Sequence, residues 1–324
     1  MSVMMSSLPP DLMNPVRLNG RVACRLMLDL TAYLVGPTEQ ELEYLISLYE
    51  RLCPKDRLVK YKIAELQYWA PVAQPHLTAS GRAAAAAGVP RPYLEPVRRR
   101  IREGRAFEIQ YWDGRGIDEA DGSWSFSCRR VHLQASGHHS FVRVLIPLQS
   151  DPGILTALAG ALAKHVALYS GHAGLTFTYD PWLKEAAFNH IYAQARRYWG
   201  IDIEDLNATL LQMKKGIKGV SWLTLLGQAY MADLRIQPAL AALGKRTDVV
   251  VERRAMATLL LAGAQPVAGD QHRPDNTLAP YIAIAQALQP LMVPMHPDFS
   301  GEKFVRNGNT TGWLNRFTDP GGWR

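Results

Sequence analysis

Apolar and polar residues alternate from Arg21 to Val35, a pattern typical of a β-strand that buries one face. Gly36 and Pro37 follow directly, and both residue types mark the end of a strand. The sequence therefore predicts that the folded part of the chain begins with a strand. The apolar residues of its buried face are Val22, Cys24, Leu26, Leu28 and Leu30.

After Thr38 the apolar residues are spaced by three and four positions, as on one face of a helix. Thr38 and Glu41 have the Thr-x-x-Glu spacing of a capping box, in which each side chain binds the other residue's backbone N–H. We expect a helix to start here, with its glutamates on the outer side. The apolar residues are Leu42, Leu45, Ile46, Tyr49 and Leu52, and the glutamates are Glu39, Glu41, Glu43 and Glu50.

Strand patterns recur along the rest of the chain, and short turns separate most of them. Asp151-Pro152 and Asp180-Pro181 introduce two helices, because aspartate caps a helix and proline fits its first turn. Further strands are predicted at 58–73, 107–112, 124–133, 140–148, 174–179, 220–226, 248–252 and 255–261. Further helices are predicted at 154–168, 182–199, 235–243 and 277–289.

So many strands joined by short turns predict an α+β fold, with a largely antiparallel β-sheet and helices packed on it. Residues 1–18 are expected to form a loose N-terminal arm, and 19–324 a single compact domain. Two similar strand–helix–strand halves, at 19–73 and 140–179, are an open possibility. The C-terminal tail is expected to pack through its aromatic residues, Phe299, Phe304, Trp313 and Phe317.

The composition, with 48% hydrophobic and 20% charged residues, is ordinary for a folded soluble protein. Residues 1–10 lack the pattern of a signal peptide, and no apolar run reaches about 18 residues, so we expect a cytoplasmic protein without a membrane span. Cys24, Cys53 and Cys128 are far apart and odd in number, which excludes a disulfide framework and a zinc-ligand spacing.

The formal net charge is +7, and much of the excess lies in the segment Arg98 to Arg105. One alternative function is therefore nucleic-acid binding through this basic segment, although no zinc-finger, KH or ribonucleoprotein motif accompanies it. The surrounding stretch 78–105 is rich in alanine, proline and arginine. We interpret it as a helix, a break and a second helix from about Tyr93, or as an irregular surface excursion.

The usual catalytic motifs are absent from the sequence. Neither a Gly-x-x-x-x-Gly-Lys-Ser/Thr phosphate loop nor a Gly-x-Ser-x-Gly nucleophile elbow occurs, and Lys214 to Gly219 is interpreted as a basic surface turn. The adjacent His138 and His139 are expected to point to opposite sides of a strand. A second alternative function is a metal-assisted hydrolase that uses the loop with Asp270 and His272. The other interpretation of that loop is a hydrogen-bonded cap for the next helix.

Two loops are rich in carboxylates. Because the sequence shows no evident histidine or arginine partner for them, we expect these acids to be solvated and available to a basic protein partner. We therefore take them as candidate interface residues, and assign no catalytic, cofactor or metal residue. The first group consists of Asp118, Glu119 and Asp121, and the second of Asp202, Glu204 and Asp205.

Three tracts carry a resemblance to a known family: Tyr198 to Asn207, Gly219 to Gly227, and Gly269 to Trp313. They resemble the type VI immunity family, whose members are cytoplasmic antidotes to antibacterial type VI secretion effectors. The resemblance implies a protein that binds one cognate effector toxin, often a nuclease, and blocks its active or substrate-binding site. It implies no catalysis, no cofactor, no membrane and no direct contact with nucleic acid. A basic nuclease would meet the acidic loops, whereas Arg98 to Arg105 would instead face the toxin's metal-binding carboxylates.

Overall fold

A computed structural model describes residues 8–72, 91–117, 122–134, 137–273 and 278–323. It contains an 11-stranded sheet whose neighbouring strands are all antiparallel. The strands are β1 (Val16–Leu18), β2 (Arg21–Leu34), β3 (Lys60–Ile63), β4 (Ala70–Pro71), β5 (Phe107–Trp112), β6 (Ser125–Leu133), β7 (Gly137–Ile146), β8 (Leu168–Tyr179), β9 (Leu223–Gly227), β10 (Val249–Arg253) and β11 (Ala257–Ala262). Their order is β10-β11-β9-β8-β2-β7-β6-β5-β3-β4, and β1 also pairs with β2. The prediction of an α+β fold with an antiparallel sheet is confirmed.

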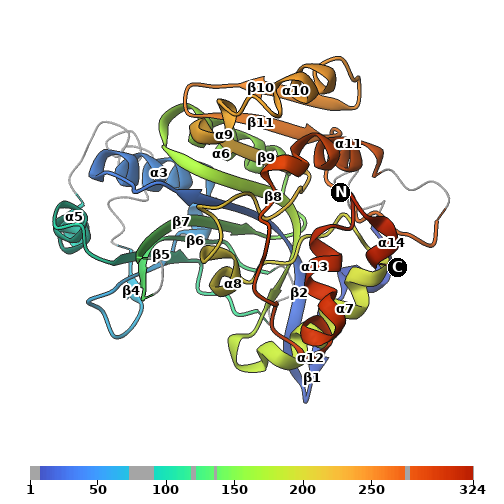
Figure 1. Cartoon of the computed structure of the whole chain (residues 1–324). Helices are drawn as coiled ribbons and strands as arrows, with labels where there is room; N and C mark the ends of the chain where they lie inside the picture. The colour runs from blue at the N-terminus through green and yellow to red at the C-terminus, as the bar shows by residue number, and fades with distance from the viewer. Residues whose placement is uncertain (1–7, 73–90, 118–121, 135–136, 274–277, 324) are drawn as a thin grey trace.

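Helices pack on this sheet and at one of its ends (Figure 1). The α-helices are α2 (Pro10–Met13), α3 (Glu39–Leu52), α5 (Glu95–Arg102), α6 (Gly153–His165), α7 (Lys184–Arg197), α8 (Leu206–Leu210), α9 (Gln228–Met231), α10 (Gln237–Leu243), α11 (Ala279–Leu288), α12 (Glu302–Val305), α13 (Asn309–Leu314) and α14 (Pro320–Trp323). The 3₁₀ helices are η1 (Lys55–Arg57), η3 (Pro92–Leu94), η4 (Pro181–Leu183), η5 (Gln289–Leu291) and η6 (Arg306–Gly308). Helices α7, α12, α13 and α14 form a group beside the end of the sheet where β2 begins.

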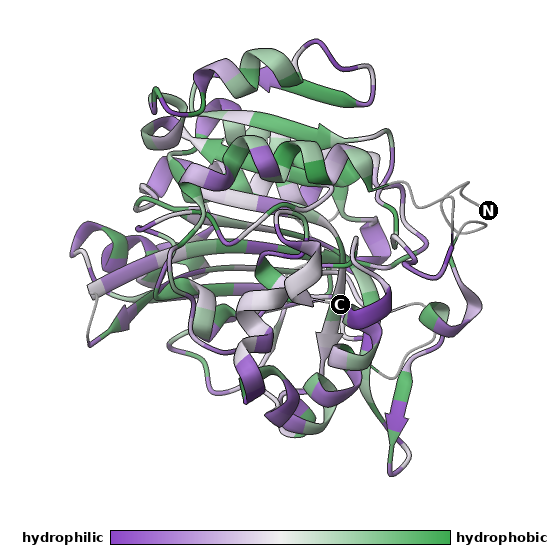
Figure 2. Cartoon of the chain, turned by 45° about the vertical axis from the view of Figure 1, so that its right-hand side comes forward, coloured by the Kyte–Doolittle hydropathy of each residue, from purple (hydrophilic) through white to green (hydrophobic). Residues whose placement is uncertain are grey.

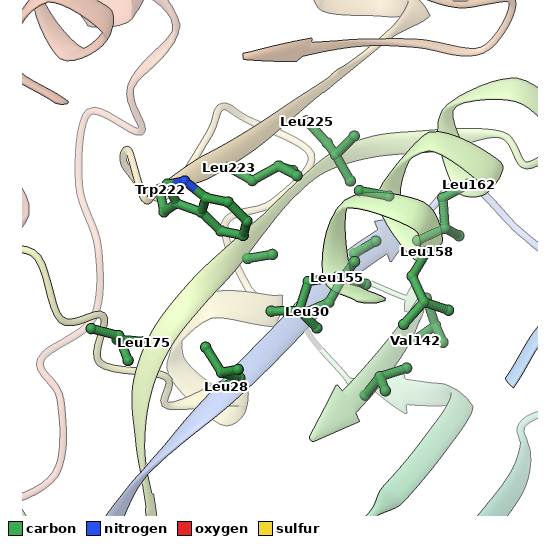
Figure 3. Packing of buried hydrophobic residues seen from close by; sticks show 14 of the residues in the cluster. Leu28, Leu30, Val142, Leu155, Leu158, Leu162, Leu175, Trp222, Leu223 and Leu225 are labelled. Atoms are coloured by element: carbon green, nitrogen blue, oxygen red, sulfur yellow. The ribbon is translucent and has the colours of Figure 1, made fainter. Parts of the chain in front are cut away.

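The central strand β2 buries both of its faces. Its alternate leucines pack under α6, and Figure 3 shows Leu30 beside Leu155 of that helix. The other face carries polar residues that are also buried, among them Asp29 and Thr31. Burying polar groups costs free energy unless they find partners, so this second face must be satisfied by other polar groups.

The predicted capping box at the start of α3 is confirmed. The Glu41 N–H donates to Thr38 Oγ1 at 3.2 Å, and the Thr38 N–H donates to Glu41 Oε2 at 2.8 Å. The glutamates of α3 are not all on its outer side, however. Glu50 is buried, and its Oε2 forms an ion pair with Arg91 Nη2 at 2.6 Å. Arg91 is itself buried and needs a charged partner.

The N-terminal segment and one predicted strand differ from expectation. From Leu8 onward the expected loose arm is packed: Leu8 and Leu12 lie in the hydrophobic core, and β1 pairs with β2. The segment 58–73 forms the two short strands β3 and β4, because the chain turns after Ile63, whose carbonyl accepts the Leu66 N–H. Pro71 lacks a backbone N–H, which suits β4 to the edge of the sheet.

One hydrophobic cluster extends from Leu8 to Trp323 and contains the tail aromatics, as predicted for Phe299, Phe304, Trp313 and Phe317. Figure 2 shows hydrophobic residues concentrated in the central strands and the helices on them. This shared core supports the prediction of a single compact domain, which stays a prediction, as does the idea of two similar halves. None of the helices among the described residues combines the length and apolar character needed to cross a bilayer.

Candidate functional site

The acidic tract after α7 is buried, which corrects the expectation that it is solvated. Asp202, Glu204 and Asp205 are 4%, 1% and 3% exposed. The tract runs beside β8, where the Asp202 N–H donates to the Leu175 carbonyl at 2.8 Å. This hydrogen bond places the tract, with its carboxylates, beside the polar face of the central strands. Whether any of the three contacts a protein partner stays a prediction.

A buried lysine and a buried histidine contact two of these acids. Lys218 Nζ lies 2.8 Å from both Asp202 Oδ2 and Glu204 Oε2, and also donates to the Ile203 carbonyl at 3.0 Å. His172 Nε2 lies 3.0 Å from Asp202 Oδ2 and 2.9 Å from Glu204 Oε2. We refer to Tyr33, His172, Asp202, Glu204 and Lys218 as the ionic cluster.

The ionic cluster lies where strand pairing turns polar side chains toward the segment that follows α7. His172 of β8 pairs with Thr31 of β2, on the face opposite the leucines that meet α6. The Tyr33 hydroxyl, from the same face of β2, donates to Glu204 Oε2 at 3.0 Å. Next to it, Arg143 Nη2 forms an ion pair with Asp29 Oδ2 at 2.7 Å. The cluster therefore joins β2 and β8 to the 202–218 segment.

Charge pairing outweighs burial in the ionic cluster. Burial alone would raise the pKa of Glu204, but Lys218 and His172 hold it well below its usual value. Burial would lower the pKa of Lys218, yet Asp202 and Glu204 raise it. Burial, followed by the charges of Glu204 and Asp202, raises the pKa of Tyr33 well above normal. Glu204 is thus ionised, Lys218 is charged and the Tyr33 phenol is neutral at physiological pH.

The same residues contain a set of potential metal ligands. His172, Asp202 and Glu204 place their donor atoms within 4.8 Å of one another, and no other group of this kind occurs among the described residues. Lys218 Nζ lies within hydrogen-bonding distance of the two carboxylates and 3.4 Å from His172 Nε2. The ammonium group therefore takes the place that a cation would have, and the cluster is an internal ionic brace of the fold.

Sequence analysis missed His172 and misplaced Lys218, which it assigned to a surface turn. Lys218 is 7% exposed, because the chain after Lys215 turns inward and pairs Ile217 with Met292. The third acid, Asp205, has other partners. Lys184 Nζ donates to Asp205 Oδ1 at 3.0 Å, and the Ser300 hydroxyl donates to Asp205 Oδ2 at 3.0 Å. Asp205 thus joins the start of α7 to the C-terminal tail.

The Asp270 loop is hydrogen-bonded within the fold. Arg197 donates to both carboxylate oxygens of Asp270, at 2.9 and 2.8 Å, and the His272 N–H donates at 3.0 Å. The Arg197 hydrogen bond is the main reason why the pKa of Asp270 is lowered. The His272 side chain is exposed, and the two residues form no ligand group. The hydrolase interpretation therefore loses its proposed ligand pair.

The basic segment 98–105 is largely paired with acids. Arg98 Nε donates to Glu43 Oε1 at 2.9 Å, and Arg102 binds Glu39 at 2.8 Å, so both arginines join α5 to α3. Arg100 and Arg105 also pair with glutamates, Glu65 and Glu103 respectively. Because of these ion pairs, few arginines of this segment are free to bind the phosphates of a nucleic acid.

The other acidic group, Asp118, Glu119 and Asp121, lies outside the described residues. The residues on either side of it, Ile117 and Ser123, line a surface groove of about 790 Å³. Its lining includes Gln110 of β5, Ser125 and Ser127 of β6, and several aromatic residues. We refer to this feature as the aromatic groove. Sequence analysis gave no indication of it.

Comparison with known proteins identifies the family. A family model described as type VI immunity for VRR-NUC, named TsiV, matches residues 69–317, well over half of the chain. The structure of the Pseudomonas aeruginosa T6SS protein PA0821 is similar, with a TM-score of 0.67 and 21% sequence identity over 93% of this chain and 85% of that chain. At this identity the likeness shows a common fold, and a search of curated proteins finds no match. The chain belongs to the TsiV family of type VI immunity proteins for VRR-NUC.

Proposed function

We propose that this protein neutralises one cognate type VI effector by binding its VRR-NUC nuclease domain and covering the active or substrate-binding site. The observation that carries the proposal is the family match over residues 69–317. Inhibition by contact needs no catalysis, cofactor or metal in the inhibitor. We place the protein in the cytoplasm, because a nuclease that enters a bacterium meets its nucleic-acid substrate there.

The ionisable groups of the described core support a binding role over an enzymatic one. Lys218 binds one carboxylate oxygen of Asp202 and one of Glu204, and Arg197 binds both carboxylate oxygens of Asp270. A catalytic acid, base or metal ligand must be able to reach a substrate, whereas these groups are engaged with each other.

The first test is a growth experiment. The effector encoded beside this chain's gene is expressed as its nuclease domain, with and without this protein, and the two are then tested for co-purification. We expect growth to be rescued and a stable complex to form. Continued toxicity without a complex would exclude this effector as the partner and leave the proposed inhibition without support.

Asp118, Glu119 and Asp121 remain our proposed acidic contacts, since a nuclease that holds phosphates presents lysine and arginine to its partner. Changing all three to lysine is expected to weaken binding by roughly 2–5 kcal/mol if they are central to the interface. Glu302→Lys on α12 is a matched control, because the Glu302 side chain is 66% exposed and distant in sequence. An unchanged affinity of the triple variant would remove the three acids from the interface.

A further inference from the structure

The aromatic groove has an exposed tryptophan at one wall. Trp182 lies on η4, directly after β8, and is 87% exposed. Its backbone is fixed: the Trp182 N–H donates to Asp180 Oδ1 at 2.9 Å, and the Asp180 N–H donates to the Ala23 carbonyl at 2.9 Å. No described ring or cation packs on the Trp182 indole. The fold thus holds a large apolar side chain in water on a rigid turn, without using it for packing.

Two more tryptophans, Trp69 and Trp112, line the groove. The rings of Trp69 and Trp112 lie 5.3 Å apart, and the Trp112 Nε1–H donates to the Arg115 carbonyl at 2.6 Å. Lys60 Nζ lies 5.3 Å from the centre of the Trp112 ring, so this indole already has a cation on one side. Fixed tryptophans around a hollow are typical of the centre of a protein interface, because they lose little entropy on binding.

We propose that the aromatic groove is the docking site for a lysine- or arginine-bearing loop of the effector's nuclease domain. This inference rests on the proposed function and adds to it the surface that makes the contact. The faces of indole rings attract cations, and Trp182 has its ring free to receive one. The effector's nuclease domain must carry basic side chains to bind phosphates, so covering those side chains also blocks its substrate.

The charges around the groove agree with a basic occupant. Arg21 is the one cation among the lining residues, and Asp180 neutralises it through an ion pair of 2.7 Å. Although the chain has a net charge of +7, the lining residues therefore present no unpaired cation that would repel an arginine or lysine. Lys60, whose Nζ lies 5.3 Å from the centre of the Trp112 ring, is not among the lining residues.

The size of the groove indicates what part of the interface it forms. A volume of about 790 Å³ is in the range of ligand pockets of about 300–1,000 Å³, so it accepts a few side chains rather than a whole domain. A stable protein interface buries about 800 Å² on each partner, more than one loop provides. The groove is thus the anchoring centre, surrounded by further contacts.

The test measures the affinity of the full chain for the effector's nuclease domain with its catalytic site disabled. We expect Trp182→Ala to raise Kd about 30-fold or more, as for a central tryptophan contact. Leu234→Ala is the matched control, because Leu234 is 83% exposed and does not line the groove. If the unmodified chain does not bind, the proposed function fails. If it binds and Trp182→Ala binds equally well, only the groove inference is overturned.

Two further variants test the chemistry of the occupant. Trp182→Phe keeps an aromatic face and Trp182→Leu keeps only apolar surface, so a cation on the ring predicts that affinity falls in the order tryptophan, phenylalanine, leucine. Wild-type affinity for Trp182→Leu would overturn the basic occupant. A single-stranded DNA oligonucleotide tests the alternative that these tryptophans stack on nucleic-acid bases. DNA binding that Trp182→Ala abolishes, with effector binding unchanged, would also overturn the proposal.

Discussion

The ionic cluster and the aromatic groove both involve strands of the same sheet, but they differ in which side chains are buried. In the ionic cluster, charged side chains that look suited to a partner are buried and bound to each other. In the aromatic groove, a tryptophan that would suit a core is exposed and has no described packing partner. The first region connects parts of the fold to each other, and the second leaves side chains available to a partner. Substitutions in the two regions should therefore separate stability from affinity.

Lys218→Met should give the largest effect of all, and on stability. It leaves Asp202 and Glu204 buried with less compensating charge, which typically costs about 3–5 kcal/mol. Urea unfolding of the purified variant measures this loss. Lys215→Met is the control, because Lys215 is exposed. Equal stability of Lys218→Met and the unmodified chain would mean that the cluster is not a brace.

Tyr33→Phe should have the next largest effect. The change removes the hydroxyl that donates to the ionised Glu204 Oε2 at 3.0 Å, and hydrogen bonds to charged groups contribute about 1.5–3 kcal/mol. Denaturant unfolding again gives the value, with Tyr68→Phe as the control because Tyr68 is 81% exposed. If both variants lose the same amount, the Tyr33 hydroxyl contributes nothing specific.

The pH dependence of stability should reveal the cluster's charges. The folded-state pKa of Glu204 lies well below 4.5, so its contribution is complete above pH 4.5 and is lost as the pH falls toward the folded value. The pKa of Lys218 lies above 10.5 in the folded state, so its contribution is complete below pH 10.5 and is lost as the pH rises further. Each proton taken up on unfolding changes stability by about 1.4 kcal/mol per pH unit.

Glu204→Gln isolates this effect from that of the other acids. Below pH 4.5 the unfolding free energy of the variant should fall less steeply than that of the unmodified chain, by up to about 1.4 kcal/mol per pH unit. Urea titrations at several values between pH 3 and pH 6 give both slopes. Parallel slopes would show that Glu204 keeps a normal pKa in the folded protein.

Local sequence patterns predicted the strands and helix caps of the two regions, but not which side chains meet there. The strand predicted from Arg21 to Val35 and the capping box of Thr38 and Glu41 involve neighbours in sequence, and both were confirmed. The strand buries both of its faces, however, and not only the one that the alternation indicated. The Asp180 cap was likewise predictable from its own turn. The family resemblance was also readable, and the match over residues 69–317 confirmed it.

The partners in the ionic cluster could not be found by the same means. Lys218 lies 16 positions from Asp202 and 46 from His172, so a search of nearby residues finds no partner for the acids. The register of β2 and β8 brings His172 into place, and sequence patterns do not fix that register. The groove could not be predicted for the same reason, since its lining residues come from η4, β5 and Trp69, which are far apart in the chain.

The smallest stability effect should come from the residue with the largest proposed role in binding. Trp182→Ala removes a side chain that is 87% exposed and packs on no described ring, so the unfolding free energy should change by less than about 0.5 kcal/mol. Thermal and urea unfolding of the variant used for the affinity measurement test this directly. A large loss of stability would show that the indole supports η4 and the ends of β2 and β8. Unchanged stability with weakened effector binding would place Trp182 in the interface, since a side chain that the fold does not need can act only through what it contacts outside the chain.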